Sequence, residues 1–206
     1  MFITLEGPEG SGKTTIAKRI IEVLEKQDYP VIYTREPGGS VIAEQIRKII
    51  LRKKNVAMDP LTEALLFAAS RRQHLVEKIL PALKRGKIVI CDRFIDSSLA
   101  YQGYARAIGI DKVMDINLFA TEGKLPDLTI YFDISSQDGL ARIDGDSKRE
   151  INRLDLERLD FHNKVREGYL ELLRRYPKRI VKVDAAQSIE KVTEAVLNII
   201  IERIKR

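Results

Sequence analysis

Residues 7–14 read Gly-Pro-Glu-Gly-Ser-Gly-Lys-Thr, and their types and spacing match the phosphate-binding loop pattern. The three glycines permit a tight loop in which backbone N–H groups can approach phosphate oxygens closely. Lys13 would reach the β- and γ-phosphates, and the Thr14 hydroxyl would hold Mg²⁺. The octapeptide therefore predicts a site for a nucleoside triphosphate.

The residues on either side of this loop support the interpretation. Residues 2–6 (Phe-Ile-Thr-Leu-Glu) form a β-prone run, and residues 14–26 carry a helical repeat of apolar side chains. A strand, a glycine loop and a helix N-terminus together direct N–H groups at one anion. The alternative, a glycine-rich turn that binds nothing, is disfavoured by this context.

The rest of the chain alternates between short β-branched runs and helical repeats. The pattern predicts further strands at 31–34, 88–91, 128–132 and 179–183, and helices within 42–50, 65–83, 113–119, 159–173 and 189–200. Such alternation predicts an α/β domain with a five-stranded parallel sheet and helices on both faces. We expect a single domain over residues 1–206, with its site at the carboxyl ends of the strands.

Polar residues follow the second and third expected strands as well as the first. Arg35-Glu36-Pro37-Gly38-Gly39 follows the second strand, and Asp92-Arg93-Phe94 follows the third. Asp92 ends an apolar strand, which is the usual setting for a carboxylate that acts through the coordination shell of magnesium. The alternative for Asp92 is a helix N-cap.

Composition narrows the classes of partner. The net charge is +6 over 206 residues, with Lys and Arg spread along the chain, which favours small anionic substrates over nucleic acid. A single cysteine, Cys91, excludes an intrachain disulfide, and with two histidines it argues against a structural zinc site. The chain shows no membrane-spanning run and no signal peptide, so we expect no membrane partner and a cytoplasmic location.

A switch GTPase is disfavoured because two of its sequence elements are missing. No aspartate is followed three residues later by glycine, and Asn163-Lys164-Val165-Arg166 departs from the guanine-reading pattern at its last position. A kinase that acts on a phosphorylated acceptor instead needs two anions held close together and a closable segment that excludes water.

Four internal blocks resemble the signature blocks of the thymidylate kinase family, in that family's order and spacing. They are residues 34–39 (TREPGG), 67–72 (FAASRR), 92–94 (DRF) and 96–103 (DSSLAYQG), and residues 152–169 are similar to the family's lid end and following helix. The resemblance covers essentially the whole chain and is closest to the bacterial form. It implies a P-loop NTPase fold with a short lid, Mg²⁺- and ATP-dependent phosphorylation of dTMP to dTDP, and a homodimer.

The resemblance also implies which residues hold dTMP. Arg93 and Arg47 would grip the 5′-phosphate, Phe67 would stack on thymine, and Tyr101 would pack under the deoxyribose. On sequence alone Arg47 could be a solvated surface residue, Phe67 a core residue and Tyr101 a helix-surface residue. The full set implied for dTMP is Glu9, Glu36, Arg47, Phe67, Ser70, Arg71, Arg93, Ser98, Tyr101 and Gln102.

On the donor side, the resemblance implies a lid over residues 142–153 that closes over ATP. This phosphate loop carries no arginine, so the lid would supply positive charge at the transferring phosphoryl group. Many family members have aspartate where Glu9 stands. The residues implied for ATP binding are Gly7, Pro8, Glu9, Gly10, Ser11, Gly12, Lys13, Thr14, Thr15 and Arg142. Those implied for metal binding are Thr14 and Asp92. Those implied for catalysis are Lys13, Asp92, Arg93, Arg149 and Arg153.

The chemistry so implied needs no general base, because the second pKa of the acceptor phosphate is about 6 and its attacking oxygen is ionised near neutral pH. His74 and His162 lie in helical repeats and are expected at the surface or in helix packing. Three other functions stay open: a different small-molecule kinase, a non-enzymatic ATP-binding regulator and a nucleic-acid-binding module. Substrate profiling, ADP release and the salt dependence of DNA affinity would distinguish them.

Overall fold

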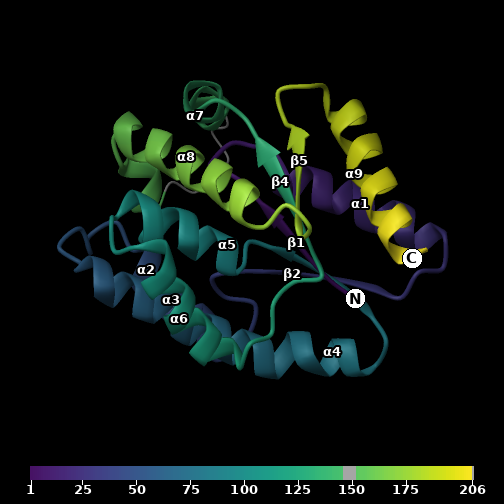
Figure 1. The fold of residues 1–206 in the computed structure, drawn as a ribbon, viewed down its shortest axis with the longest axis horizontal. Coiled ribbons are helices and arrows are strands. Elements are labelled where there is room, and N and C mark those ends of the chain that lie inside the picture. Colours follow the sequence, from purple (N-terminus) through teal and green to yellow (C-terminus); the bar gives the residue numbers. More distant parts are fainter. Residues whose placement is uncertain (146–151, 206) are drawn as a thin grey trace.

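The structure, a computed structural model, describes residues 1–145 and 152–205 and centres on a five-stranded parallel sheet (Figure 1). The strand order is β2-β3-β1-β4-β5, so β1 lies in the middle. The strands are β1 (Phe2–Glu6), β2 (Val31–Arg35), β3 (Ile88–Asp92), β4 (Leu128–Asp133) and β5 (Ile180–Asp184). All five lie within one residue of the predicted positions.

Each strand sends alternate side chains into one of two cores, because successive residues of a strand point to opposite faces. In β1, Phe2 packs into one core, while Ile3 and Leu5 pack into the other. In β3, Val89 and Ile90 divide in the same way. Burial on both faces explains why these strands read as continuous apolar runs rather than as alternating ones.

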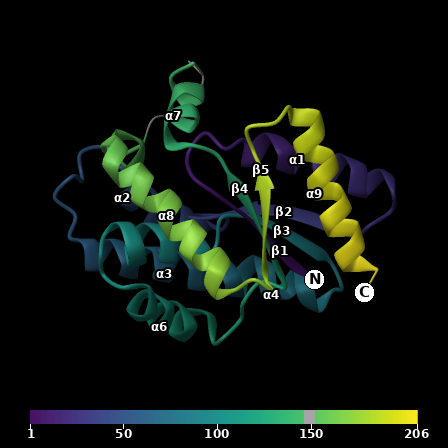
Figure 2. The same ribbon diagram turned by 45° about the horizontal axis from the view of Figure 1, so that its top comes forward.

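The helices divide unequally between the two faces. α1 (Lys13–Lys26) and α9 (Ile189–Ile204) pack on each other and on one face of the sheet, as Figures 1 and 2 show. The remaining helical segments cover the other face and the edges: α2 (Val41–Leu51), α3 (Pro60–His74), η1 (Leu75–Ile79), α4 (Leu80–Lys84), α5 (Ile95–Ser98), η2 (Leu99–Ala105), α6 (Ile110–Thr121), α7 (Ser136–Asp144), η3 (Leu154–Leu156) and α8 (Leu159–Arg175).

Two of these segments are π-helices, which the helical repeats do not reveal. η1 joins α3 to α4 within the region expected as one helix, and η2 continues α5. The second packs closely against α8, since a Cβ at Gly168 would lie only 3.0 Å from the Cα of Ala100. π-Helical turns occur frequently at functional sites, and η2 carries both Tyr101 and Gln102.

The parallel sheet brings the carboxyl ends of its strands to one edge, where the expected polar segments meet. Glu36 N donates to Asp92 O at 2.9 Å, and Arg93 N donates to Leu5 O at 2.9 Å. The first three strand ends are therefore held together directly by the main chain. No helix in the described part of the chain is long and apolar enough to cross a membrane.

Candidate active site

A continuous cavity of about 1580 Å³ runs along the carboxyl edge of the sheet. One end is bounded by the phosphate loop, Arg142 and the start of α9, and the other by α2, α3 and η2. The predicted residues that line it are Glu9, Gly10, Ser11, Gly12, Lys13, Thr14, Thr15, Glu36, Arg47, Phe67, Arg71, Asp92, Arg93, Ser98, Tyr101, Gln102 and Arg142. Most of the residues proposed for the two nucleotides therefore share one space.

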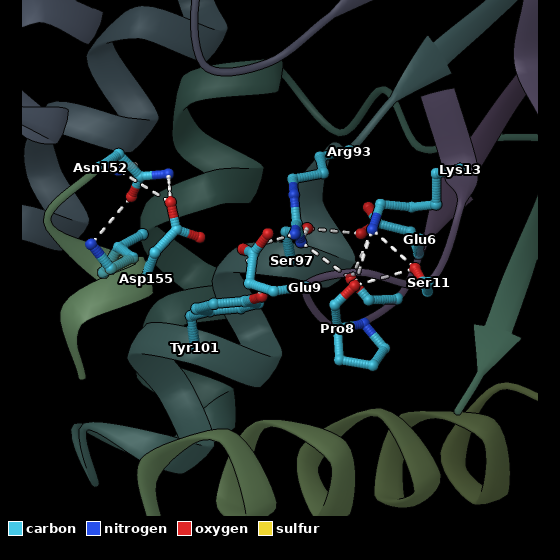
Figure 3. A network of polar contacts seen from close by, with 12 residues as sticks. Glu6, Pro8, Glu9, Ser11, Lys13, Arg93, Ser97, Tyr101, Asn152 and Asp155 are labelled. Carbon is cyan, nitrogen blue, oxygen red and sulfur yellow. Dashed lines mark hydrogen bonds and ion pairs between the residues drawn. The ribbon is translucent and has the colours of Figure 1, made fainter. Parts of the chain in front are cut away.

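The phosphate loop ends at Gly12, whose φ of 81° places it in the left-handed region and directs α1 toward the cavity. The Lys13 ammonium lies inside the loop, where it donates to Gly7 O at 3.0 Å, to Pro8 O at 2.9 Å and to Ser11 Oγ at 2.9 Å (Figure 3). Burial, assisted by the charge of Arg93, lowers the pKa of Lys13 to about 8. A phosphate in the loop would supply the missing negative charge.

Gly10 in the loop and Gly139 in α7 let the phosphate loop pack closely against that helix. Gly10 has a φ of 70°, and a Cβ there would collide with the backbone of Gly139 in α7. A Cβ at Gly139 would in turn collide with Glu9 O. Gly139 has no motif signal in the sequence, because this contact joins residues about 130 positions apart in the chain.

The two predicted metal ligands are adjacent. Thr14 Oγ1 donates to Asp92 Oδ2 at 2.7 Å, and the Tyr33 hydroxyl donates to the same oxygen at 3.2 Å. A threonine hydroxyl beside a carboxylate at the phosphate loop is the donor set that Mg²⁺ uses in P-loop proteins. The residues present thus fit a hydrated Mg²⁺ ion bound to the donor phosphates.

Arg93 lies at the centre of the cavity in an unusual backbone conformation, with a φ of 69°. Its guanidinium donates to Gly7 O at 3.0 Å, to Ser97 Oγ at 3.1 Å and to Glu9 Oε1 at 2.7 Å. Glu9 also accepts a hydrogen bond from the Tyr101 hydroxyl at 3.0 Å. Figure 3 shows Arg93 beside Glu9 and Tyr101. Its guanidinium contacts the phosphate loop and also lies over the ring of Tyr101, so one arginine borders both halves of the cavity.

Glu6, which has no motif signal in the sequence, supports Arg93 through Ser97 and Tyr169. Its carboxylate accepts from Phe94 N at 2.7 Å, from Ser97 Oγ at 2.5 Å and from the Tyr169 hydroxyl at 3.0 Å. Burial, together with the charge of Asp96, raises the pKa of Glu6 to about 7. The hydroxyls of Ser97 and Tyr169 both contact Arg93, so Glu6 fixes the surroundings of that arginine.

Arg71 is almost completely buried and most of its donors are engaged. Nε donates to Glu36 Oε2 at 2.8 Å, one terminal nitrogen donates to Ser98 Oγ at 3.0 Å and to Asn117 Oδ1, and the other donates to Phe94 O at 2.8 Å. Asn117, from α6, has no motif signal in the sequence. This network fixes the guanidinium plane at the wall where a base edge is expected.

His74 differs from its expected position. It is fully buried at the end of α3, and Nδ1 lies 2.9 Å from Glu36 Oε1 while Nε2 lies 2.6 Å from Thr34 Oγ1. The helical repeat does not reveal that its partners come from β2 and the following turn. His162 is also buried, so neither histidine is a surface residue.

Glu36, His74 and Cys91 place three metal-ligand atoms within 4.8 Å of one another. The Glu36 carboxylate is already paired with the Arg71 cation, and Cys91 Sγ donates to Arg93 O at 3.1 Å. Burial raises the pKa of the Cys91 thiol well above its ordinary value, which disfavours the thiolate that a metal requires. We therefore interpret this cluster as a hydrogen-bonded support of the turn at residues 36–39.

Ser70 does not line the cavity, contrary to its assignment to dTMP. It is fully buried, accepts from Gly38 N at 3.2 Å and donates to Ala43 O at 3.4 Å. The side chain therefore supports the turn before α2. Its position one residue before Arg71 places it on a different side of α3, which the motif alone does not show.

The segment expected as a lid is described only at its two ends. Arg142 donates to Ala185 O at 3.0 Å and lines the donor end of the cavity, whereas Arg149 lies outside the described residues. Arg153 is buried; it donates to Ile50 O at 3.0 Å and forms an ion pair with Glu63. This placement contradicts its assignment as a free cation at the phosphoryl group, because its charge is already paired away from the cavity.

Taken together, the parallel sheet, the phosphate loop and an opposing arginine-containing pocket define a P-loop kinase of the nucleoside monophosphate class. The family model for thymidylate kinase matches residues 5–196, and the chain belongs to that family. It is 65% identical to a thymidylate kinase of Clostridium novyi, with 95% of each chain covered. It is 59% identical to one of Anoxybacillus flavithermus, covering 100% of this chain and 99% of the relative.

A solved structure agrees with this assignment. The crystal structure of thymidylate kinase from Ehrlichia chaffeensis superposes with a TM-score of 0.78 at 34% identity and covers 97% of each chain. The resemblance found in the sequence blocks and the expected P-loop fold are thus both confirmed.

Proposed function

We propose that this cavity transfers the γ-phosphoryl group of ATP to the 5′-phosphate of dTMP, with ADP and dTDP as products. The family and its full-length relatives support the activity. The observation that carries the residue-level proposal is the position of Arg93, whose guanidinium donates to Gly7 O in the phosphate loop and lies over the ring of Tyr101 in the polar pocket. Two phosphate groups repel each other, so they can come close together only where positive charge between them reduces that repulsion.

The donor binds at the phosphate loop and the acceptor at the opposite wall. Lys13 and the loop N–H groups hold the ATP phosphates, and Arg142 lies beside the adenine end with Ala185 and the start of α9. Arg93 and Arg47 hold the phosphate of dTMP, and Phe67 supplies an apolar face for the base. Arg47 donates to Pro37 O at 2.8 Å and lines the same cavity as Arg93.

Thr14 and Asp92 are the residues that would hold Mg²⁺. Bound there, the ion would neutralise charge on the donor phosphates and orient them. The chain contributes alignment and positive charge, through Lys13 and Arg93 and, we propose, through Arg149 of the lid. A general base is unnecessary, because the acceptor phosphate is already ionised near neutral pH.

A coupled ADP-release assay with ATP and each common nucleoside monophosphate tests this proposal. We expect dTMP to be preferred, dUMP to be used less well and purine monophosphates to be rejected by size. One methyl group contributes only about 1–3 kcal/mol, so the preference over dUMP is expected to be modest. Preference for another monophosphate would contradict the substrate assignment, and ATP binding without ADP release would contradict the enzyme assignment.

We also propose that the protein is a homodimer formed through α2, α3 and α6. These helices pack on one another and expose several apolar side chains: Val41 and Ile42 and Ile49 on α2, Leu61 and Leu65 on α3, and Phe119 on α6. Phe119 is 89% exposed, which is unusual for so large an apolar group. Sedimentation of the wild type and of Phe119→Asp or Leu65→Glu would test this; a wild-type monomer would refute it.

A cytoplasmic location is part of the same proposal, because the proposed substrates ATP and dTMP belong to the nucleotide pool from which DNA precursors are made. Fractionation of cells that express the chain would test it. Recovery of the protein outside the cytoplasmic fraction would contradict it.

A further inference from the structure

Glu63 is a buried carboxylate on α3 that the proposed chemistry does not use. It is 1% exposed and accepts hydrogen bonds at both oxygens. Oε1 accepts from Gln102 Nε2 at 2.8 Å and from Arg106 Nε at 3.4 Å. Oε2 accepts from Arg106 at 3.4 Å and from Arg153. The carboxylate therefore connects a residue of the base pocket to the buried Arg153 and the partly buried Arg106.

The charge state of Glu63 follows from these contacts. Burial alone would raise its pKa, but the hydrogen bond from Gln102 and the charges of Arg106 and Arg153 hold the pKa below its ordinary value. An ionised carboxylate is an acceptor only. Gln102 must therefore present its NH₂ group to Glu63, and its carbonyl oxygen, Oε1, faces away from it.

Gln102 is 1% exposed and lines the cavity beside Arg71, Ser98 and Tyr101. Among the described residues, no hydrogen bond is made to its Oε1, and this atom is not one of the fully buried unsatisfied ones. The free oxygen is thus available to a ligand in the cavity. An amide whose orientation is fixed can discriminate between a donor and an acceptor on the ligand, whereas a freely rotating amide cannot.

We infer that Glu63 is a specificity-determining positioning residue, which fixes the Gln102 amide so that the pocket presents an acceptor to the base. An acceptor forms a hydrogen bond with the N3–H donor of thymine or uracil. At N3 of cytosine the same acceptor meets a second acceptor, so no hydrogen bond forms and the two lone pairs repel each other. Arg71 adds a donor on the same wall, which suits the O4 acceptor of thymine. This inference rests on the proposed function and names the chemical feature by which that site rejects cytidine nucleotides.

Glu63→Gln should reverse the direction of this hydrogen bond. Two arginine donors meet at Oε2, whereas among the described residues the only arginine contact at Oε1 is the long one from Arg106 Nε at 3.4 Å, so the new carbonyl oxygen should take the Oε2 position and the new NH₂ should face Gln102. Gln102 would then turn its own NH₂ toward the base. We expect the ratio of kcat/KM for dTMP to that for dCMP to fall by about tenfold or more, since polar mispairing in a closed site is strongly discriminated.

The experiment measures kcat/KM for dTMP, dUMP and dCMP with wild type and three variants. dUMP shares the N3–H and O4 edge with dTMP, so Glu63→Gln should leave the dTMP to dUMP ratio unchanged, whereas general loosening of the pocket would alter both ratios. Glu157→Gln is the matched control. It removes the other carboxylate partner of Arg106, at 2.5 Å, and has no contact with Gln102, so the dTMP to dCMP ratio should stay at the wild-type value.

The double variant Glu63→Gln, Gln102→Glu exchanges the two side chains and keeps one carboxylate in the cluster. In this variant the amide at position 63 donates to the carboxylate at position 102, which again presents an acceptor to the base, so selectivity against dCMP should recover.

If circular dichroism shows that Glu63→Gln does not fold, the double variant provides the test: a folded double variant without thymine preference overturns the inference. A folded Glu63→Gln with the wild-type dTMP to dCMP ratio also overturns it. Failure of the wild type to use dTMP refutes the proposed function instead.

Discussion

The two ends of the cavity are built in different ways. At the donor end, eight consecutive residues, 7–14, supply the phosphate loop, and its binding groups are mostly backbone N–H groups. At the acceptor end, the polar wall is assembled from the turn after β2 and from α3, α5, η2 and α6, and its groups are side chains. One end is local in sequence and the other depends on the whole fold.

This difference affects how each end tolerates change. Backbone donors persist when side chains are replaced, provided that the loop keeps its glycines and its contact with Gly139. The acceptor wall depends on buried charge pairs such as Arg71 with Glu36. Removal of one partner leaves the other charge unpaired in a dry interior, which is costly. We therefore expect changes at the donor end to affect catalysis and changes at the acceptor wall to affect recognition.

The largest effect is expected for Lys13→Ala, which removes the side-chain charge of the donor end. Loss of one preorganised charge at a transferring group typically lowers kcat by about 10²–10³. Steady-state ADP release measures kcat, and calorimetric titration with dTMP is the control, since acceptor binding should stay close to wild type. Unchanged kcat would remove Lys13 from the mechanism.

Arg93→Ala tests the residue that borders both ends. We expect kcat/KM for dTMP to fall by about 100-fold, because loss of a buried charge partner typically costs about 2–5 kcal/mol. ATP affinity, measured by titration, should change little, since the loop N–H groups remain. An equal loss of affinity for both nucleotides would show that Arg93 belongs to the donor end rather than to the dTMP phosphate.

A smaller effect is expected for Asn117→Ala, which removes a partner of Arg71 without touching the cavity lining. Loss of one hydrogen bond to a charged group costs about 1.5–3 kcal/mol, so KM for dTMP should rise by about tenfold. The KM for ATP should be unchanged, and Tm should report any general loss of stability. A rise in both KM values would contradict the division between the two ends.

The smallest effect concerns pH. The pKa of Lys13 is about 8, so its charge is largely lost between pH 7 and pH 9, and ATP affinity of the free protein should fall by up to about tenfold over that range. Lys13→Arg is the control, because a guanidinium stays charged throughout and its affinity profile should be flat. A falling profile for Lys13→Arg as well would assign the titration to another group.

Several features follow from local patterns and were predictable. The five β-branched runs fold as strands, of which β1, β3 and β4 are buried on both faces, and the loop at 7–14 turns tightly because Gly7, Gly10 and Gly12 adopt positive φ. The family blocks also indicated most of the cavity lining, including Phe67, Arg93 and Tyr101. Residue type and spacing were sufficient for the strands and the loop, whereas the cavity lining was implied by the resemblance to the family.

Other features depend on contacts between distant segments. Arg153 was expected to be a lid cation but is paired with Glu63, 90 positions earlier in the chain. Ser70 was expected in the dTMP pocket but instead accepts a hydrogen bond from Gly38 N. Glu6, Asn117 and Gly139 had no recognisable signal, since each acts through a partner brought close only by folding. The sequence by itself determined the strands and the phosphate loop, because local patterns of residue type encode them, and its resemblance to the thymidylate kinase family indicated the kind of reaction. The tertiary structure alone decided which buried charges pair, and therefore which polar atoms remain free to recognise a base.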